Sequence, residues 1–336
     1  MAKVGKKSLT FDNVYLQESG VVVGPKEYEG PLKEDFDNHF DDLRCGQKSW
    51  ELAEIVMYRN ALNICLNKNN MEIKDIDCVV SGDLNNQIII GNYVLRDYDV
   101  PYLGVFNACS SSVEGLIVAS NLIQANGFKN IVVAISSHNA TAERQYRYPT
   151  EYGGQKPETT TSTVTAAAST LVSDKPSLIK VTKATVGRVV DAKINDALDM
   201  GRAMAPAAYN TINQHFVDFD VDPSEYDLIL TGDLSYYGSD MLIKIFQEYD
   251  VDITKNHNDG GLMIYDRDQQ KVFSGGSGCG CLPAVMYSNV IKRMLNGELK
   301  KILCVGTGAL LNPIILAQKE TIPAIAHAVV LERVIQ

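Results

Sequence analysis

Two stretches of the chain align with each other without a gap, and together they decide the fold. Residues 60–84 read NALNICLNKNNMEIKDIDCVVSGDL, and residues 210–234 read NTINQHFVDFDVDPSEYDLILTGDL. Both stretches end in the letters GDL, so that Asp83 aligns with Asp233. The distance between them is far longer than the repeat unit of a solenoid. The sequence therefore predicts two halves that are built on one plan.

A second pair of matching segments follows the first in each half. CSSSVEGLIVASN at residues 109–121 matches SGCGCLPAVMYSN at residues 277–289, and the apolar stretches KNIVVAISS and KKILCVGTG come at about the same distance beyond. Residues 49–68 carry apolar side chains at helical spacing, and DCVVSG, LGVFNA and NIVVAIS are short apolar runs typical of strands. Strands that are apolar throughout and alternate with helices indicate a parallel sheet covered on both faces. We expect a layered α/β/α/β/α sandwich of two pseudo-symmetric βαβα halves, at residues 1–175 and 176–336.

Composition and charge exclude several classes of protein. The 336 residues are 45% hydrophobic and 21% charged, as in ordinary globular proteins, and the formal net charge is −10. Because Lys and Arg form no long cluster, the chain lacks the basic face that nucleic acid requires. The apolar runs are too short to span a bilayer, and we expect neither a signal peptide nor an integral membrane segment. Seven scattered cysteines are typical of reduced thiols in a cytosol-like compartment, and their spacing does not indicate a metal site.

One cysteine stands where a nucleophile could be. Cys109 lies in FNACSSSVEGL, residues 106–116, between an apolar stretch and the start of a predicted helix. A helix N-terminus lowers the pKa of a thiol and supplies backbone N–H groups, so this position suits a nucleophile. Two other roles are open: a small buried hydrophobe at a tight strand-to-helix junction, or part of the floor of a pocket that does no chemistry.

Motifs over almost the whole chain resemble those of a known family. A duplicated half, with a cysteine opening one helix and the Gly-rich GGSGCGC opening its counterpart, is similar to the thiolase fold and, within it, to ketoacyl-ACP synthase III. The match is sharper to the bacterial stage V sporulation protein AD family, which the chain resembles in GPKEYEGPL, GQKSWELAE, SGDLNNQ, NACSSSVEG, SSHNATAERQYRYPTEYGGQKP, MAPAAYNTI, LILTGDLS, GGSGCGC and GTGALLNP. The resemblance implies a thiolase-like five-layer fold. It also implies binding of dipicolinic acid (pyridine-2,6-dicarboxylic acid), which proteins of that family help to move into the developing spore.

The sequence departs from a condensing enzyme at two positions. An enzyme of the kind that this chain resembles needs a histidine in the second-half GDL loop and an asparagine at the start of the second-half helix, to stabilise an enolate and its oxyanion. The loop here reads Gly232-Asp233-Leu234, and the helix start aligned by the internal repeat is Ser277. Losing one such donor costs about 3–4 kcal/mol, and an ionised Asp233 would repel the developing charge. We therefore expect no condensing activity and no catalytic role for Cys109.

The segment 138–165 offers groups that suit a planar dicarboxylate. His138 ends a predicted strand on the side where the cysteine loop emerges, and ligands of α/β sheets gather beyond the carboxyl ends of parallel strands. Arg144, Arg147 and Tyr148 follow in the chain. Arginine is bidentate toward carboxylates, and a tyrosine ring packs on flat aromatics. The alternatives are a capping role for His138 and, for the segment, a solvated loop or an arm that wraps a partner subunit.

Four further residues complete the predicted ligand site. Ser110 follows the cysteine at the first helix start, and Ser277 stands at the equivalent start in the second half. Asp83 and Asp233 occupy equivalent loops, where a carboxylate commonly caps a helix or a turn. The alternative for one of the two aspartates is binding of Ca²⁺ that accompanies dipicolinate.

The preferred hypothesis is a non-catalytic thiolase-fold protein that binds dipicolinic acid, alone or with calcium, and needs no cofactor. The resemblance implies a cytoplasmic protein, peripheral on the inner membrane of the forespore, with other stage V sporulation membrane proteins as partners. Two alternatives stay open: an acyl transferase or condensing enzyme that uses Cys109, and an architectural subunit with a vestigial pocket. In thiolase-fold proteins the strand entering the nucleophile loop commonly pairs across a dimer twofold. Here that strand would be residues 102–107, so we expect a homodimer.

Overall fold

The computed structural model describes residues 2–147 and 155–334, and Tyr148 lies outside the described residues. Ten strands form the main path of a large sheet, in the order β12-β11-β14-β15-β10-β3-β9-β7-β5-β6. Five of them come from the first half of the chain: β3 (Tyr15–Val23), β5 (Cys78–Gly82), β6 (Tyr102–Gly104), β7 (Asn130–Ser137) and β9 (Ala166–Ser173). Five come from the second half: β10 (Ile179–Thr185), β11 (Leu228–Thr231), β12 (His257–Asp259), β14 (Lys301–Ala309) and β15 (Ala324–Arg333).

The two sets of strands repeat the same pairing outward from the point where they meet. They join through β3 and β10, which pair over only two residues of each strand. From that joint, β3, β9, β7, β5 and β6 pair antiparallel, antiparallel, parallel and parallel, and β10, β15, β14, β11 and β12 do the same. This symmetry confirms the two halves that the internal repeat predicts. The parallel pairing that the sequence predicts is confirmed for β5, β6 and β7 and for their counterparts β11, β12 and β14. Strands β9 and β15 pair antiparallel with their neighbours, because neither is reached through a helix that crosses a sheet face.

Short strands and helical turns complete the chain. Strands β1 (Ala2–Val4) and β2 (Ser8–Thr10) pair beside β10, β4 (Asn38–His39) pairs with β3, and β8 (Thr161–Thr163) pairs with β13 (Gly275–Ser277) in a separate ribbon. The short helices are α1 (Pro25–Tyr28), α5 (Asn139–Tyr146), α8 (Gly260–Met263), α11 (Pro313–Leu316) and the 3₁₀ turns η1 (Lys33–Asp35), η2 (Ile73–Asp75) and η3 (Pro223–Glu225).

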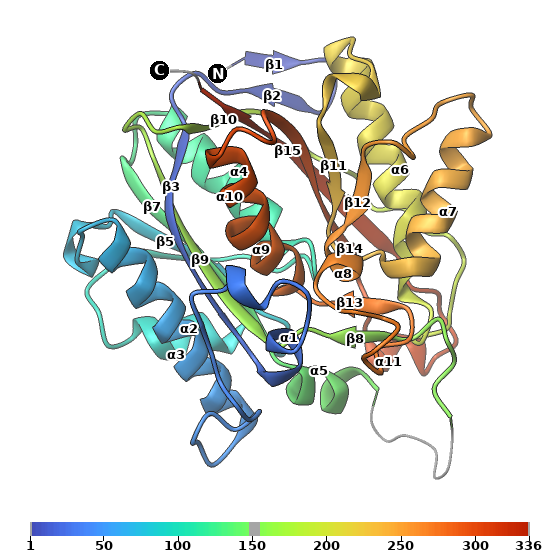
Figure 1. The fold of residues 1–336 in the computed structure, drawn as a ribbon, viewed down its shortest axis with the longest axis horizontal. Helices are drawn as coiled ribbons and strands as arrows, with labels where there is room; N and C mark the ends of the chain where they lie inside the picture. Colours follow the sequence, from blue (N-terminus) through green and yellow to red (C-terminus); the bar gives the residue numbers. More distant parts are fainter. Residues whose placement is uncertain (1, 148–154, 335–336) are drawn as a thin grey trace.

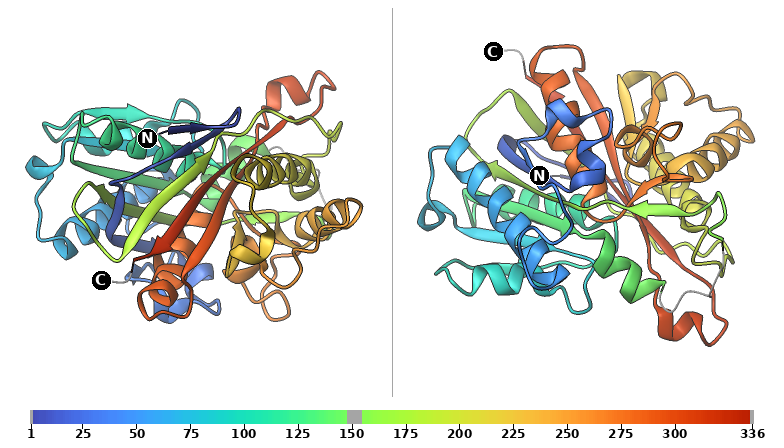
Figure 2. Two further views of the ribbon diagram at one scale, coloured as in Figure 1. Left: turned by 90° about the horizontal axis from the view of Figure 1, so that it is seen from above. Right: turned by 60° about the horizontal axis from the view of Figure 1, so that its bottom comes forward.

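The longer helices make the outer and central layers of the sandwich (Figures 1 and 2). Helices α2 (Trp50–Lys68) and α3 (Ile89–Leu95) cover the outer face of the first half, and α6 (Met200–Phe219) and α7 (Ser235–Gln247) cover that of the second. Between the halves lie α4 (Ser111–Gln124) and a continuous rod of α9 (Cys281–Val285), the π-helical turn η4 (Met286–Val290) and α10 (Ile291–Leu295). The structure therefore has the thiolase-like five-layer fold.

Small residues allow the layers to pack closely. Helix α2 begins at Ser49, whose hydroxyl accepts a hydrogen bond of 3.3 Å from the Leu52 amide. Its buried face lies on β3 at Gly20, where a Cβ would meet the Ala61 carbonyl oxygen at 2.3 Å. A larger residue at position 20 would force the helix away from the sheet.

The boundary predicted between residues 175 and 176 stays a prediction, because the two halves share the central part of the hydrophobic core. It falls in the connection between β9 and β10. Apolar side chains of α4 pack in the same buried cluster as strand residues of both halves, for example Leu116 with Val133 and Ile302. Among the described residues, no helix is both long enough and apolar enough to cross a membrane.

Candidate ligand cavity

Cys109 lies at the interface of the two halves, directly before α4. Its loop approaches β14 of the other half at two glycines: a Cβ at Gly308 would lie 2.5 Å from the Asn107 carbonyl oxygen, and one at Gly306 would lie 3.2 Å from the Cα of Ser110. Ala108, immediately before the cysteine, has the left-handed φ of 48°. These close contacts hold the Cys109 sulfur 3.9 Å from the Ser277 hydroxyl.

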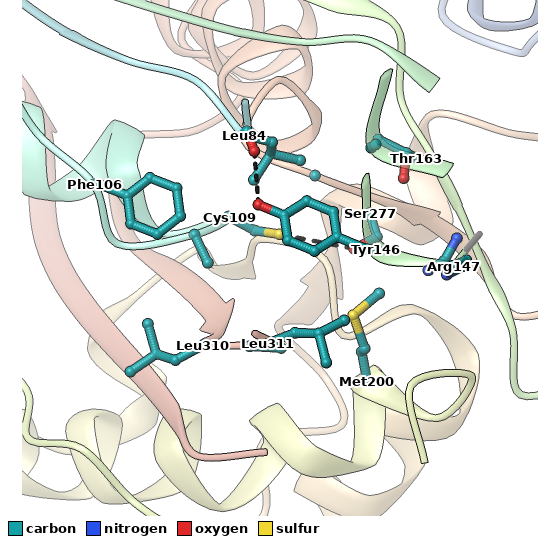
Figure 3. Close-up of a pocket in the computed structure, with 14 residues that line it drawn as sticks. Leu84, Phe106, Cys109, Tyr146, Arg147, Thr163, Met200, Ser277, Leu310 and Leu311 are labelled. Atoms are coloured by element: carbon teal, nitrogen blue, oxygen red, sulfur yellow. Dashed lines mark hydrogen bonds between the residues drawn. The ribbon is translucent and has the colours of Figure 1, made fainter. Parts of the chain in front are cut away.

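A small, mostly apolar cavity opens above the Cys109 sulfur (Figure 3). The free space inside is about 40 Å³, enough for a few water molecules. Its walls come from both halves and consist of Leu84, Phe106, Ala108, Cys109, Ala142, Tyr146, Arg147, Thr163, Met200, Ser277, Gly278, Ala309, Leu310 and Leu311. Among the described residues, Arg147 is the single charged residue in this wall.

The surroundings of Cys109 favour the protonated thiol. Burial raises its pKa well above the ordinary value, and the nearby Asp233 carboxyl group raises it further. Both effects oppose the helix N-terminus, which taken alone favours the thiolate. Since a protonated thiol attacks poorly, the position at a helix start does not by itself make Cys109 a nucleophile.

Asp233 links three segments of the second half behind the cysteine. One of its carboxyl oxygens accepts hydrogen bonds from the Ser277 hydroxyl at 2.7 Å and the Gly278 amide at 3.1 Å. The other accepts from the Thr307 hydroxyl at 2.6 Å. Burial raises the pKa of this carboxyl group. Asp233 thus fixes Ser277 beside Cys109. The prediction that Ser277 starts the second-half helix is wrong, because Ser277 is the last residue of β13 and α9 begins only at Cys281.

Arg147 is the predicted residue that lies in the cavity wall with an unused hydrogen-bond donor. Its side chain is only 5% exposed. Its terminal nitrogens pair with the Glu143 carboxylate and donate to the carbonyl and hydroxyl oxygens of Thr161, at 3.1 and 3.3 Å. Its Nε, however, is buried and has no hydrogen-bond partner among residues 2–147 and 155–334. Buried charged donors rarely remain unpaired, so this group is suited to an anion.

Two other residues of the predicted segment point elsewhere. The Arg144 guanidinium is 52% exposed, pairs with Glu51 and lies over the Trp50 ring. His138 caps α5: its Nδ1 accepts from the Ala140 amide at 3.2 Å, and its Nε2 lies 2.8 Å from the Leu43 carbonyl oxygen. Burial lowers the pKa of His138. Neither residue lines the cavity, because the segment begins with a helix that turns them to other faces.

Asp83 and Ser110 also lie outside the cavity wall. Asp83 accepts hydrogen bonds from the amides of Asn85 at 2.8 Å and Ile90 at 2.9 Å. It therefore has the capping role that is common for a carboxylate in such a loop. Burial raises the pKa of Asp83 and of the neighbouring Glu54, the latter to about 8. The Ser110 hydroxyl is buried and, within the described part of the chain, has no hydrogen-bond partner. No group of three or more His, Cys, Asp or Glu side chains in that part is arranged to hold a metal ion.

Several wall residues were not predicted from the sequence. Tyr146 lies across the cavity in Figure 3, and its hydroxyl donates a hydrogen bond of 2.6 Å to the Leu84 carbonyl oxygen. Phe106, Leu311 and Met200 supply much of the remaining apolar surface. Most of these residues lie inside the motifs quoted above, but apolar side chains in a motif do not reveal which of them face a cavity.

Comparisons with known proteins agree with this architecture. The family described as Stage V sporulation protein AD matches residues 5–332. The stage V sporulation protein AD of Bacillus subtilis is 50% identical over 334 residues, which cover 99% of this chain and 98% of that protein. Among solved structures, 3-oxoacyl-[acyl-carrier-protein] synthase III from Aquifex aeolicus is 11% identical with a TM-score of 0.57, over 95% of this chain and 99% of that one. An OleA variant from Xanthomonas campestris is 15% identical with a TM-score of 0.61, over 96% and 99%.

Proposed function

This chain belongs to the stage V sporulation protein AD family, and from that premise we propose that it binds dipicolinic acid in the Cys109 cavity without catalysing a reaction. The family supports a role in sporulation. Dipicolinate is a rigid aromatic ring whose two carboxylates flank the ring nitrogen. A site for it must neutralise negative charge and cover two flat faces, which calls for cationic donors in an apolar slot.

The observation that carries this proposal is the buried Nε of Arg147, which has no hydrogen-bond partner among the described residues. A guanidinium keeps its charge in any environment, and each buried N–H without a partner costs free energy. A ligand carboxylate would satisfy this donor, while the Tyr146 ring and the side chains of Phe106 and Leu311 would contact an aromatic ring.

The absence of catalysis is part of the same proposal. Condensation needs a reactive thiolate and donors for a developing oxyanion. In this chain burial keeps the Cys109 thiol protonated, and the group fixed beside it is the Ser277 hydroxyl, which already donates to Asp233. An enzyme that uses Cys109 remains the alternative, since the compared synthase is named for its condensing chemistry.

Binding to membrane partners, a location on the inner membrane of the forespore, and calcium as a companion of the ligand belong to the proposal as well. A calcium ion would be held by the bound dicarboxylate, because the two aspartates Asp83 and Asp233 are occupied by hydrogen bonds from the protein. Homodimer formation through β6 also belongs here, and the exposed side chains of Leu103 and Phe106 beside that edge support it.

Isothermal titration calorimetry with two isomers tests the proposal. Pyridine-2,6-dicarboxylate should bind, and pyridine-2,5-dicarboxylate should bind far more weakly, because its carboxylates lie at opposite ends of the ring and cannot both reach positions that the protein fixes for a meta pair. Equal affinity for both isomers, or no binding of either, would mean that the pocket is vestigial and that the architectural role is correct.

A further inference from the structure

Tyr146 separates two spaces of very different size. The Cys109 cavity has about 40 Å³ of free space, whereas a groove on its outer side has about 580 Å³. Phe106, Tyr146, Leu310 and Leu311 line both spaces. One water molecule needs about 10–15 Å³ of such free space, so the inner cavity holds only a few waters. It is too small for an aromatic dicarboxylate.

A pair of hydrogen bonds to one acceptor holds Tyr146 in place. The Leu84 carbonyl oxygen accepts from the Tyr146 hydroxyl at 2.6 Å and from the Gln145 side-chain amide at 3.1 Å. The side-chain oxygen Oε1 of Gln145 in turn accepts from the Asn86 backbone amide at 2.9 Å. The last turn of α5 is therefore fastened to the loop of residues 84–88, and this fastening keeps the tyrosine ring over the sulfur of Cys109 (Figure 3).

The loop on the other side of this fastening is strained. Gln87 and Ile88 have consecutive left-handed φ values of 67° and 47°. A β-branched side chain such as that of isoleucine seldom adopts this conformation, because its Cβ crowds the backbone. Residues of this kind cost about 1–3 kcal/mol each, so the closed arrangement holds a conformation that the loop alone disfavours.

We infer that Tyr146 gates the passage between the outer groove and the Cys109 cavity. Its hydrogen bond to the Leu84 carbonyl oxygen, here called the latch, keeps this gate closed. This inference rests on the proposed function in taking the cavity as the ligand site. When the latch opens, the ring moves toward the groove, the inner cavity gains the volume of the ring, and the Nε of Arg147 becomes accessible. A bound ligand then occupies the space that the ring has left.

Alkylation of Cys109 measures the opening directly and needs no ligand. The full-length protein is treated with a small neutral maleimide, and labelling of each cysteine is followed by mass spectrometry. Tyr146→Phe removes the latch, a hydrogen bond worth about 0.5–1.5 kcal/mol, and should speed labelling of Cys109 by about two- to tenfold. Tyr287→Phe is the matched control, because the Tyr287 hydroxyl is buried without a hydrogen-bond partner among the described residues. It should leave the rate at Cys109 unchanged.

Tyr146→Ala removes the gating ring itself and should speed labelling of Cys109 further, while the other buried cysteines keep their rates. An unchanged rate in both Tyr146 variants, or equal acceleration at all seven cysteines, would contradict gating by Tyr146. Dipicolinate separates this inference from the proposed function. If Tyr146→Phe accelerates labelling but dipicolinate does not protect Cys109, Tyr146 gates the cavity and the proposed ligand is wrong. If dipicolinate protects Cys109 but Tyr146→Phe is labelled at the wild-type rate, the proposed ligand is correct and gating by Tyr146 is wrong.

Discussion

Ser277 donates a hydrogen bond of 2.7 Å to Asp233, and this contact occupies the hydroxyl that lies next to the Cys109 sulfur. The pair joins the two positions at which the sequence departs from a condensing enzyme. In place of donors aimed at developing negative charge, the cavity floor has a protonated thiol with a carboxyl group behind it. The proposed absence of catalysis rests on this arrangement.

The protein should not form an acyl-enzyme. Incubation with acyl-CoA and acyl-carrier thioesters should leave Cys109 unmodified, because burial and Asp233 both raise the pKa of its thiol. Intact-protein mass spectrometry measures the acyl adduct directly. An adduct on Cys109, with turnover above that of Cys109→Ala, would establish the enzyme alternative.

Cys109→Ala should weaken dipicolinate binding only slightly. The substitution removes one buried sulfur from the cavity floor but no charged hydrogen bond, so the loss is one of packing. We expect a change in affinity of a fewfold by calorimetry, well below the effect of removing a charged donor. Complete loss of binding in a folded Cys109→Ala protein would mean that the sulfur contacts the ligand in a way that packing does not explain.

Glu54→Gln should make the protein more stable at pH 8. Burial, together with the neighbouring Asp83, raises the pKa of Glu54 from 4.5 to about 8. The unfolded chain loses this proton near pH 4.5 and the folded protein near pH 8, so the wild type loses stability as the pH rises between these values. Glutamine has no proton to lose and still bonds with Asn85 or Ser136, so we expect a gain on the order of 2 kcal/mol at pH 8 and little at pH 4.5.

Urea unfolding at the two pH values measures this difference. Glu51→Gln is the matched control, since it changes the same residue type at a partly exposed position of α2. A Glu54→Gln protein that is less stable than the wild type at both pH values would show that the carboxylate is needed in its ionised form.

The protein should be a homodimer. Strand β6 lies at one end of the sheet, and Leu103 within it is 41% exposed, while Phe106 just beyond it is 50% exposed. An apolar edge strand that remains free invites pairing with another chain. Light scattering at tens of micromolar should give twice the mass of the chain, and Leu103→Arg should shift it to the monomer. A monomeric wild type would overturn this expectation.

The fold could be predicted because the sequence contains it twice. The alignment of residues 60–84 with 210–234 identifies the equivalent helices and strands, and the structure repeats their pairing in both halves. The same alignment pairs Ser277 with Cys109, and the two side chains lie 3.9 Å apart across the interface of the halves, although Ser277 ends β13 and does not start a helix. What the alignment does not contain is the antiparallel position of β9 and β15, which depends on how the chain returns to the sheet.

The ligand site could be predicted only in part, because it depends on directions that the sequence does not reveal. Arg144 and Arg147 have the same chemistry and lie three residues apart, yet α5 turns one to solvent and the other into the cavity. The state of the Cys109 thiol depends on burial and on Asp233, which is distant in sequence. His138 illustrates the same limit, since a residue at a strand end can cap the next helix as readily as it can face a ligand.

The central claim is that the buried Nε of Arg147 binds a carboxylate of dipicolinate, and Arg147→Ala tests it most directly. Losing a charged hydrogen bond to a ligand costs about 1.5–3 kcal/mol, so calorimetry should show affinity reduced by about ten- to a hundredfold. Arg144→Ala is the matched control, because it removes an exposed arginine from the same helix and should leave the affinity unchanged. Circular dichroism confirms that both variants are folded. Wild-type affinity in a folded Arg147→Ala protein, or an equal loss in both variants, would contradict the account.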